Sequence, residues 1–327
     1  MKKTEDLSER YLHYRDVLRE RYHCKVYKIP IALPVTCPNR DGMAGSGGCT
    51  FCGSIGAGYE RRDYLSITEQ IDRSTASMVR KYKSEKFIPY FLNYTNTYAP
   101  PGKFTAWVDE SLRHEKTVGL DVSTRPDCIH EVYLDILKEA SQKYGKDITI
   151  ELGLQSVNPH TLLRLNRCHT AAECIDAALR IGRYGFDLCV HLIIDFPFDD
   201  MVDVVEAAKF LSALPVTQVK LHSLFLVKGT ELAREYENGE FQLLSIDDYA
   251  ERAAVFLSYL RPDIAVQRMA GRAYGETILT ANWGRPWWEV QARVEEELEK
   301  KDIHQGDRCR YLDGAAVRHF IKGYGGK

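Results

Sequence analysis

Three cysteines near the N-terminus have the spacing of metal ligands. Cys37, Cys49 and Cys52 follow the pattern C-x11-C-x2-C, in a glycine-rich loop that comes after an apolar stretch. Four thiolates complete an iron–sulfur cluster or a structural zinc site, so three are too few for a closed site. Three thiolates on a [4Fe–4S] cluster would leave one iron open to a ligand from outside the protein. The pattern therefore indicates an open iron–sulfur site.

Other interpretations of the cysteines have to be weighed. A lone C-x2-C pair is most often a zinc site or a redox pair, but no nearby C-x2-C or H-x3-H pair supplies a fourth zinc ligand. A secreted disulfide framework is not expected, because there are nine cysteines in 327 residues and no recognisable signal peptide. The other six are expected to be buried free thiols: Cys24, Cys128, Cys168, Cys174, Cys189 and Cys309.

Further motifs follow the cysteines and carry a family resemblance. The run Cys37-Pro38-Asn39-Arg40-Asp41-Gly42 with Cys49-x2-Cys52 resembles the wide-spaced cysteine motif of the radical S-adenosylmethionine (SAM) enzymes related to the elongator catalytic subunit. Within that group the chain is similar to the bacterial YtqA/YhcC-type family, over roughly residues 20 to 285. The other matching motifs are Ser123-Thr124-Arg125-Pro126-Asp127, Glu151-Leu152-Gly153-Leu154-Gln155-Ser156, Leu165-Asn166-Arg167-Cys168-His169-Thr170 and His191-Leu192-Ile193-Ile194-Asp195-Phe196-Pro197.

The resemblance implies two cofactors and a reaction type. Cys37, Cys49 and Cys52 would hold a [4Fe–4S] cluster, and SAM would chelate its open iron through the amino and carboxylate groups. One electron then cleaves the sulfonium and releases a 5′-deoxyadenosyl radical, which is chemistry that side chains cannot perform without a cofactor. A small electron-transfer protein of the flavodoxin or ferredoxin type is the expected reductant.

Three residues are candidates for polar contacts to SAM. Arg167 occupies the place of the carboxylate-binding arginine of related enzymes, and its planar fork can bond two oxygens at once. A solvated arginine at a helix end is the alternative. Gln155 offers one acceptor and two donors to the ribose hydroxyls. His191 stands where some relatives carry a ribose-binding aspartate.

Some candidate positions depart from the family pattern. Ser123 is a candidate for SAM binding although close relatives often have glutamate there. Thr95-Asn96-Thr97 replaces the glycine-rich stretch that binds the SAM amino group in many radical SAM enzymes, and its backbone carbonyls are expected to do the same. Phe51, between the last two cysteines, is expected to shield the cluster or to pack on adenine, with an ordinary core position as the alternative.

Strand and helix patterns alternate along the chain. Six predicted strands with helical crossovers and short connections indicate a parallel sheet of the α/β class. Such a sheet curls into a partial (β/α)6 barrel, the radical SAM fold, which is open on one side and could admit a large substrate there. The predicted strands are 26–35, 87–93, 118–123, 148–154, 186–194 and 216–224, with a further strand at 263–269, and the predicted helices are 5–22, 66–82, 104–114, 129–143, 171–183, 201–213, 245–260 and 289–301.

The predicted organisation has three parts. Residues 1–24 form an N-terminal helix, residues 25–230 the radical SAM partial barrel, and residues 231–327 a small C-terminal extension that completes the substrate side. Reactive groups in parallel barrels lie at the C-terminal ends of the strands. The matched motifs lie at or just after such ends, so they are expected to converge on one rim of the barrel.

A stretch rich in arginine and aromatic residues follows the barrel. It contains Arg268, Arg272, Tyr274, Trp283, Arg285, Trp287 and Trp288. Such residues suit stacking on unpaired bases, so Arg268, Arg272, Arg285 and Trp287 are candidates for substrate binding, with a packed structural subdomain as the alternative. Residues 300–327 carry seven Lys or Arg and three Asp. This basic tail could meet RNA phosphates or form a solvated face.

Composition limits the function classes. A formal net charge of −2 gives no global basic field, so an RNA partner would need a local patch. No run of 18 apolar residues exists, so no membrane association is expected, and a cytoplasmic monomer is the expected state. By analogy with the elongator family, the favoured function is modification of a tRNA wobble uridine side chain. The alternatives are a radical SAM enzyme acting on a small molecule or peptide, and a non-catalytic iron–sulfur or zinc scaffold.

Overall fold

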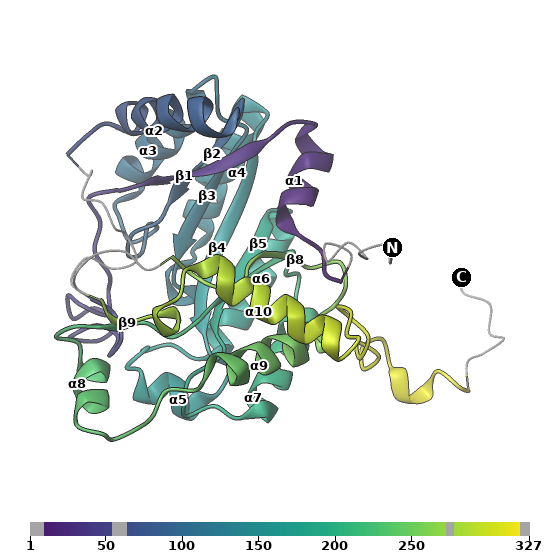
Figure 1. Cartoon of the computed structure of the whole chain (residues 1–327). Helices are drawn as coiled ribbons and strands as arrows, with labels where there is room; N and C mark the ends of the chain where they lie inside the picture. The colour runs from purple at the N-terminus through teal and green to yellow at the C-terminus, as the bar shows by residue number, and fades with distance from the viewer. Residues whose placement is uncertain (1–9, 54–63, 273–277, 321–327) are drawn as a thin grey trace.

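A single parallel sheet organises the molecule. The structure is a computed structural model that describes residues 10–53, 64–272 and 278–320. Its seven strands lie in the order β1-β2-β3-β4-β5-β6-β8 (Figure 1). The bounds are β1 (Val26–Ile31), β2 (Lys86–Phe91), β3 (Gly119–Thr124), β4 (Asp147–Gln155), β5 (Asp187–Ile193), β6 (Gln218–His222) and β8 (Ala265–Arg268). The α/β class and the curled sheet are as predicted.

Helices connect successive strands and cover one face of the sheet. Capping boxes begin four of them, including those with Ser66 opposite Glu69 and Ser245 opposite Asp248. The long helices are α1 (Tyr14–Tyr22), α2 (Ile67–Tyr82), α3 (Pro101–Arg113), α4 (Glu131–Tyr144), α6 (Ala171–Tyr184), α7 (Met201–Ser212), α9 (Ile246–Tyr259) and α10 (Trp287–Lys300). Short elements that the sequence did not predict are α5 (Pro159–Arg164), α8 (Glu231–Glu237) and the antiparallel pair β7 (Leu226–Val227) and β9 (Ile278–Thr280), with single turns at Pro126–Cys128, Asn282–Gly284 and Ala315–Val317.

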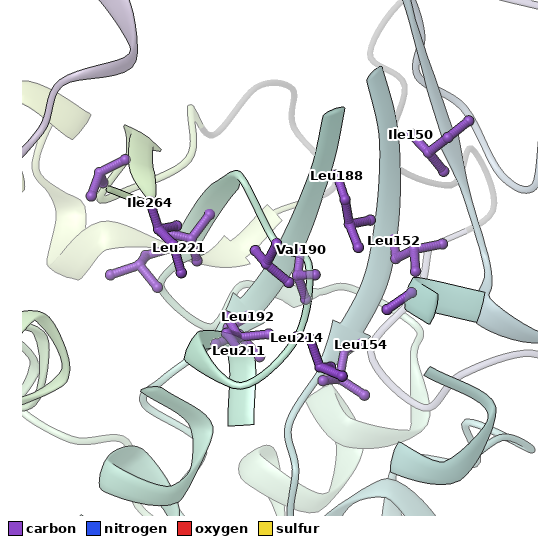
Figure 2. Packing of buried hydrophobic residues seen from close by; sticks show 14 of the residues in the cluster. Ile150, Leu152, Leu154, Leu188, Val190, Leu192, Leu211, Leu214, Leu221 and Ile264 are labelled. Atoms are coloured by element: carbon purple, nitrogen blue, oxygen red, sulfur yellow. The ribbon is translucent and has the colours of Figure 1, made fainter. Parts of the chain in front are cut away.

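The face of the sheet that meets the helices is apolar. Every second residue of β4 and β5 points to it, and Leu152 and Val190 are completely buried there. Figure 2 shows these rows packing together with Leu211 and Leu214, which belong to α7 and the turn after it. Burying each such side chain contributes about 1.5–3 kcal/mol. The core of the molecule therefore lies between the convex face of the sheet and its helices.

The opposite, concave face of the sheet is polar. Lys28 on β1, the first strand of the sheet, donates from Nζ to Gln267 Oε1 on β8, the last strand, over 2.8 Å. A side-chain pair can join the two edges only because the sheet curls round until they approach each other. The residues that meet inside the curl are called the interior polar cluster: Lys28, Asp121, Glu151, His191, Lys220 and Gln267.

Glu151 is the centre of the interior polar cluster. It is completely buried. Its Oε1 accepts from Lys28 Nζ over 2.6 Å and its Oε2 from Lys220 Nζ over 2.5 Å. His191 Nε2 lies 2.8 Å from Oε2 as well, and Gln267 Nε2 lies 3.2 Å from Oε1. One carboxylate on β4 thus contacts β1, β5, β6 and β8, and it holds the curl from inside.

The structure corrects the predicted shape of the barrel. The C-terminal extension supplies a seventh strand, β8, beside β6, so the sheet has more than the six strands predicted for residues 25–230. The contact of Lys28 with Gln267 narrows the predicted lateral opening. The N-terminal helix begins at Tyr14, later than predicted, and it packs with Leu18 across the strand beginnings, beside Ile88 and Ala265. The C-terminal ends of the strands are where the substrate is expected to enter.

The interior charges lead to a stability prediction. Replacing Glu151 by Gln leaves two buried ammonium groups without their shared anion, so the free energy of unfolding should fall by about 3–5 kcal/mol. Urea denaturation measures this. Glu289→Gln is the matched control, because Glu289 forms an exposed pair with Arg285 at 3.2 Å and should change stability by less than about 1 kcal/mol. Equal effects in the two variants would mean that the cluster does not hold the curl.

Candidate functional site

The three cysteines lie in a compact loop after β1. Within it, Gly48 N–H donates to Asn39 O over 2.8 Å and Cys52 N–H to Cys49 O over 2.9 Å. Gly47 has φ +79°, a backbone conformation that favours glycine. Gly45 has a different reason, because a Cβ at this position would collide with Asn39 Oδ1 and Cys168 Sγ. The glycines therefore let the loop fold tightly around its cysteines.

The segment after α5 anchors this loop. Asn166 donates from Nδ2 to Ser46 O over 3.0 Å and to Gly48 O over 2.8 Å. Asn39 donates in return from Nδ2 to Asn166 O over 2.5 Å. Thr50 N–H completes the connection by donating to Leu165 O over 3.1 Å. The cysteine motif and the motif that begins at Leu165 are thus two halves of one structure.

The three thiols are close enough to influence one another. Burial raises the pKa of the Cys52 thiol, Cys49 and Cys37 raise it further, and the guanidinium of Arg40 lowers it. A bound metal is what converts such thiols to thiolates. The three sulfurs do not all lie within 4.8 Å of one another, whereas a tetrahedral zinc ion with Zn–S of about 2.3 Å would hold them roughly 3.8 Å apart. The spacing and donor set fit a larger cluster better than a single ion.

Arg167 faces the cysteines. Its side chain is only 6% exposed, which rules out the solvated helix-end alternative. Nη1 donates to Cys49 Sγ over 3.1 Å, and Nη2 donates to Gly153 O and lies 2.8 Å from His169 Nε2. The buried Nε has no hydrogen-bond partner in the structure. An unpaired buried donor is costly, so an acceptor from a ligand, such as a carboxylate, would satisfy it.

Sequence analysis did not single out two further residues beside Arg167. Arg125 binds Asp127 with two hydrogen bonds of 2.8 Å and donates from Nη2 to Arg167 O over 2.8 Å, while its buried Nη1 has no partner. Burial and the charge of Arg167 lower the pKa of His169 to about 2, so this imidazole is neutral. Both residues belong to motifs quoted in the sequence analysis. The arginine two residues before an aspartate, in Arg125-Pro126-Asp127, was the pattern that could have indicated Arg125.

The Thr95–Thr97 segment uses its side chains inside the protein. Asn96 is completely buried and donates from Nδ2 to Phe91 O over 2.9 Å and to Ser123 O over 2.8 Å. Thr97 Oγ1 donates to Cys128 O over 2.8 Å. Thr95 N–H donates over 3.3 Å to the residue before Cys37, which places the segment beside the cysteine loop. The backbone carbonyl of Thr95 accepts from Tyr98 N–H over 3.0 Å, and the predicted contact of this segment with SAM stays a prediction.

Gln155, His191 and Phe51 occupy different layers. Gln155 has φ +79° at a register shift that ends β4. His191 lies on β5 opposite Gly153, before the register shift, and it is bound to Glu151. Its ring stacks on that of His222 at 5.3 Å between centroids. Phe51 packs near Phe196 at 6.3 Å in a small core cluster, so the core alternative describes its observed contacts.

The arginine–aromatic stretch does not form one patch. Arg268 ends β8 and lies beside His222 in the interior, with Nη2 3.0 Å from Nδ1. Arg272 stacks on Trp287 at 5.4 Å, and Arg285 pairs with Glu289. Trp283, in contrast, is structural, because its Nε1 donates to a backbone carbonyl over 2.7 Å. Trp288 is 59% exposed, and Tyr274 lies outside the described residues.

Comparison with known proteins agrees with this site. The sequence matches the radical SAM superfamily over residues 37–211 and the Radical_SAM C-terminal domain over residues 216–300. The chain therefore belongs to the radical SAM superfamily, whose members use a [4Fe–4S] cluster and SAM. No helix in the described parts of the chain is long and apolar enough to cross a membrane.

Individual relatives are similar over most of the chain. The identity is 34% to the uncharacterized protein YtqA of Bacillus subtilis over 299 residues, which are 90% of this chain and 92% of the relative. It is 31% to YhcC of Escherichia coli over 287 residues, 88% of this chain and 91% of the relative. The solved structure of Elp3 from Methanocaldococcus infernus, with residues 1–46 deleted, has a TM-score of 0.64 at 16% identity over 86% of this chain and 64% of that one, which shows a shared fold.

The cysteine geometry leads to a prediction on iron. Replacing Cys37, Cys49 or Cys52 by Ala should abolish the binding of about four irons per chain and the charge-transfer absorbance of a Cys-ligated [4Fe–4S] cluster. Iron analysis after anaerobic reconstitution measures this. Cys174→Ala is the control, because Cys174 is buried in α6 with the hydrophobic core. A stoichiometric zinc ion without iron uptake would contradict the cluster assignment.

The unpaired Nε of Arg167 leads to a prediction on SAM. Arg167→Ala should weaken SAM binding by about 1.5–3 kcal/mol, the contribution of a hydrogen bond to a charged group. Equilibrium binding to variants of equal iron content measures this, since Arg167 also contacts Cys49. Arg164→Ala is the matched control, because Arg164 is partly exposed on α5 and pairs with Glu235 at 2.9 Å. If both variants keep wild-type affinity, the carboxylate partner of SAM lies elsewhere.

Proposed function

We propose that this radical SAM enzyme modifies tRNA, acting on the side chain of a wobble uridine. The observation that carries the proposal is the aromatic and cationic surface beside the barrel mouth. Arg272, just past the end of β8, stacks on Trp287, and Trp288 next to it is exposed. A guanidinium can neutralise a phosphate, and an exposed indole can stack on an unpaired base. The substrate class comes from the resemblance of the sequence motifs to the elongator family, by analogy.

Residues of the chain would act at two ends of the site, one that holds the cofactors and one that admits the substrate. When bound, the [4Fe–4S] cluster and SAM supply a carbon-centred radical that removes a hydrogen atom from the substrate. Cys37, Cys49 and Cys52 hold the cluster, and Arg167 orients the SAM carboxylate. The neutral imidazole of His191 and the end of β4 at Gln155 line the way into the barrel. A flavodoxin- or ferredoxin-type protein is the proposed reductant.

A second candidate is a small molecule or peptide substrate. The formal net charge of −2 favours it, because the protein has no global attraction for RNA. The narrow gap between β1 and β8 favours it too, since Lys28 and Gln267 are within hydrogen-bond distance across it. Both candidates use the same cofactor site and differ only in what reaches the mouth of the barrel.

Salt dependence of tRNA binding tests the proposal. Binding by cluster-loaded protein should weaken steeply with salt, and Arg272→Ala with Arg285→Ala should lower the slope of log affinity against log salt by up to about 1.4–1.8, from roughly 0.7–0.9 per phosphate contact. Trp288→Ala should lower affinity with little change in slope, since stacking is not ionic.

The control uses two arginines at the opposite end of the barrel. Arg15→Ala with Arg19→Ala removes the same charge from α1, where both residues are exposed, and it should leave the slope unchanged. Nucleoside mass spectra of tRNA from cells with and without the protein identify the product. Undetectable or salt-independent binding, with unchanged tRNA nucleosides, would replace the tRNA proposal by the small-molecule candidate.

A further inference from the structure

We propose that Arg268 and His222 form a seat, inside the barrel, for an anionic group of the substrate, either a carboxylate or a phosphate. The inference rests on the proposed function only in that the barrel interior is taken as the substrate site of a radical SAM enzyme. His222 ends β6 and Arg268 ends the neighbouring strand β8. Both residues therefore lie at the C-terminal ends of parallel strands, where barrel enzymes hold their reacting molecules.

Within the described ranges of the chain, the interior contains more cations than anions. The three cationic side chains found there are Lys28, Lys220 and Arg268, and the two carboxylates are Asp121 and Glu151. Lys28 pairs with both carboxylates, and Lys220 pairs with Glu151. Among the residues that the structure describes, no carboxylate forms an ion pair with Arg268. One positive charge is therefore left over at the end of the cluster that faces the mouth.

Protonation states strengthen this surplus rather than remove it. Burial lowers the pKa of Lys220 to about 8, so its ammonium is still mostly protonated at pH 7. Burial raises the pKa of Asp121, and neutralising that carboxyl would only enlarge the surplus. The histidines add no charge, because burial and Arg268 hold the pKa of His222 well below its ordinary value, and burial lowers that of His191 to about 4.

Arg268 also has unused hydrogen-bonding capacity. Its buried Nε has no partner in the structure, and its Nη2 lies 3.0 Å from His222 Nδ1 and 3.1 Å from His222 Nε2. An imidazole is a weak partner for a guanidinium, whereas a carboxylate or phosphate binds the planar fork through two oxygens. Arg268 is partly buried, and a cation withdrawn from water without an anion is costly. An anionic ligand would satisfy both the donor and the charge.

The backbone after β8 approaches the two residues closely. Gly271 follows β8, and a Cβ there would stand 3.6 Å from His222 Nδ1 and 3.2 Å from Phe225 Cζ. Asn282 fixes this approach, because it donates from Nδ2 to Gly271 O over 2.8 Å and accepts at Oδ1 from Ser223 Oγ over 2.6 Å. Asn282 is thus a positioning residue that ties the loop after β6 to the loop after β8 around the seat.

The same interior argues against a metal ion. Ligand atoms of Glu151, Cys189 and His191 all lie within 4.8 Å of one another, which is a possible set of metal ligands. However, both oxygens of Glu151 already accept from lysine ammonium groups. A divalent cation would have to displace these lysines and would add to a surplus of positive charge. The electrostatics of the barrel therefore select an anion.

Inorganic phosphate and acetate are the probes that test the seat. The cluster-loaded full-length protein is titrated with each anion at constant ionic strength, with chloride as the balancing salt, and the midpoint temperature of unfolding gives the apparent affinity. Wild type should show saturable stabilisation by at least one probe. Arg268→Gln should weaken that affinity at least tenfold, and Arg268→Lys, which keeps the charge but not the fork, should weaken it less. Arg15→Gln, on the exposed side of α1, should leave it unchanged.

Each outcome supports or overturns the proposal. The preferred probe decides between carboxylate and phosphate. If Arg268→Gln fails to fold, Arg268→Lys and His222→Gln carry the comparison. Equal stabilisation of wild type and Arg268 variants, or none in wild type, overturns the seat. Competition between SAM and the anion, with a tenfold loss of SAM affinity in Arg268→Gln, assigns the seat to the cofactor and also overturns it. If anions bind but tRNA does not, the seat stands and the tRNA proposal fails.

Discussion

The fold depends on one buried carboxylate. Glu151 has no contact with solvent, and its two oxygens are shared among ammonium groups from β1 and β6 and an imidazole from β5. Because the two lysines come from β1 and β6, which are not neighbours of β4, the sheet can bring both to Glu151 only when it curls. Hydrophobic burial on the convex face would equally stabilise a flatter sheet. The polar interior is what favours the curled form of the sheet. Because the described interior residues include more cationic than anionic side chains, the interior favours an anionic group.

The cofactor end of the site depends on a second, separate contact. The cysteine loop has no sheet of its own and is held by the segment Leu165–Arg167 through backbone and amide hydrogen bonds. Arg167 then joins this assembly to the sheet, since it donates to both Cys49 Sγ and Gly153 O on β4. A displacement of β4 would therefore also shift the cysteines. Arg167 is thus one direct link between the curled sheet and the cofactor loop.

Local patterns in the sequence were sufficient for much of this arrangement. The alternating strands and helices and the cysteine loop could be predicted because each depends on residues close in sequence. The interior polar cluster could not, because Lys28 and Glu151 are 123 residues apart and each resembles an ordinary strand residue. β8 was predicted as a strand at 263–269, but its pairing with β6 was not, because two helices separate the two strands in the sequence. Arg268 was grouped with Arg272 by proximity in sequence, although the end of β8 separates an interior position from the outer one.

One further consequence concerns the free edge of the sheet. β8 is the last strand, and an unpaired strand edge is a template for pairing with another molecule. Residues before α1 occupy part of that edge, since Val266 N–H donates to Leu12 O over 2.8 Å, and Gln305 in turn fixes Leu12 by accepting from its N–H over 2.9 Å. Segments near the two ends of the chain thus cover part of the edge of β8 and protect it from pairing with another molecule. Trimming the N-terminus past Leu12 would expose backbone donors and acceptors along β8, and aggregation would compete with folding.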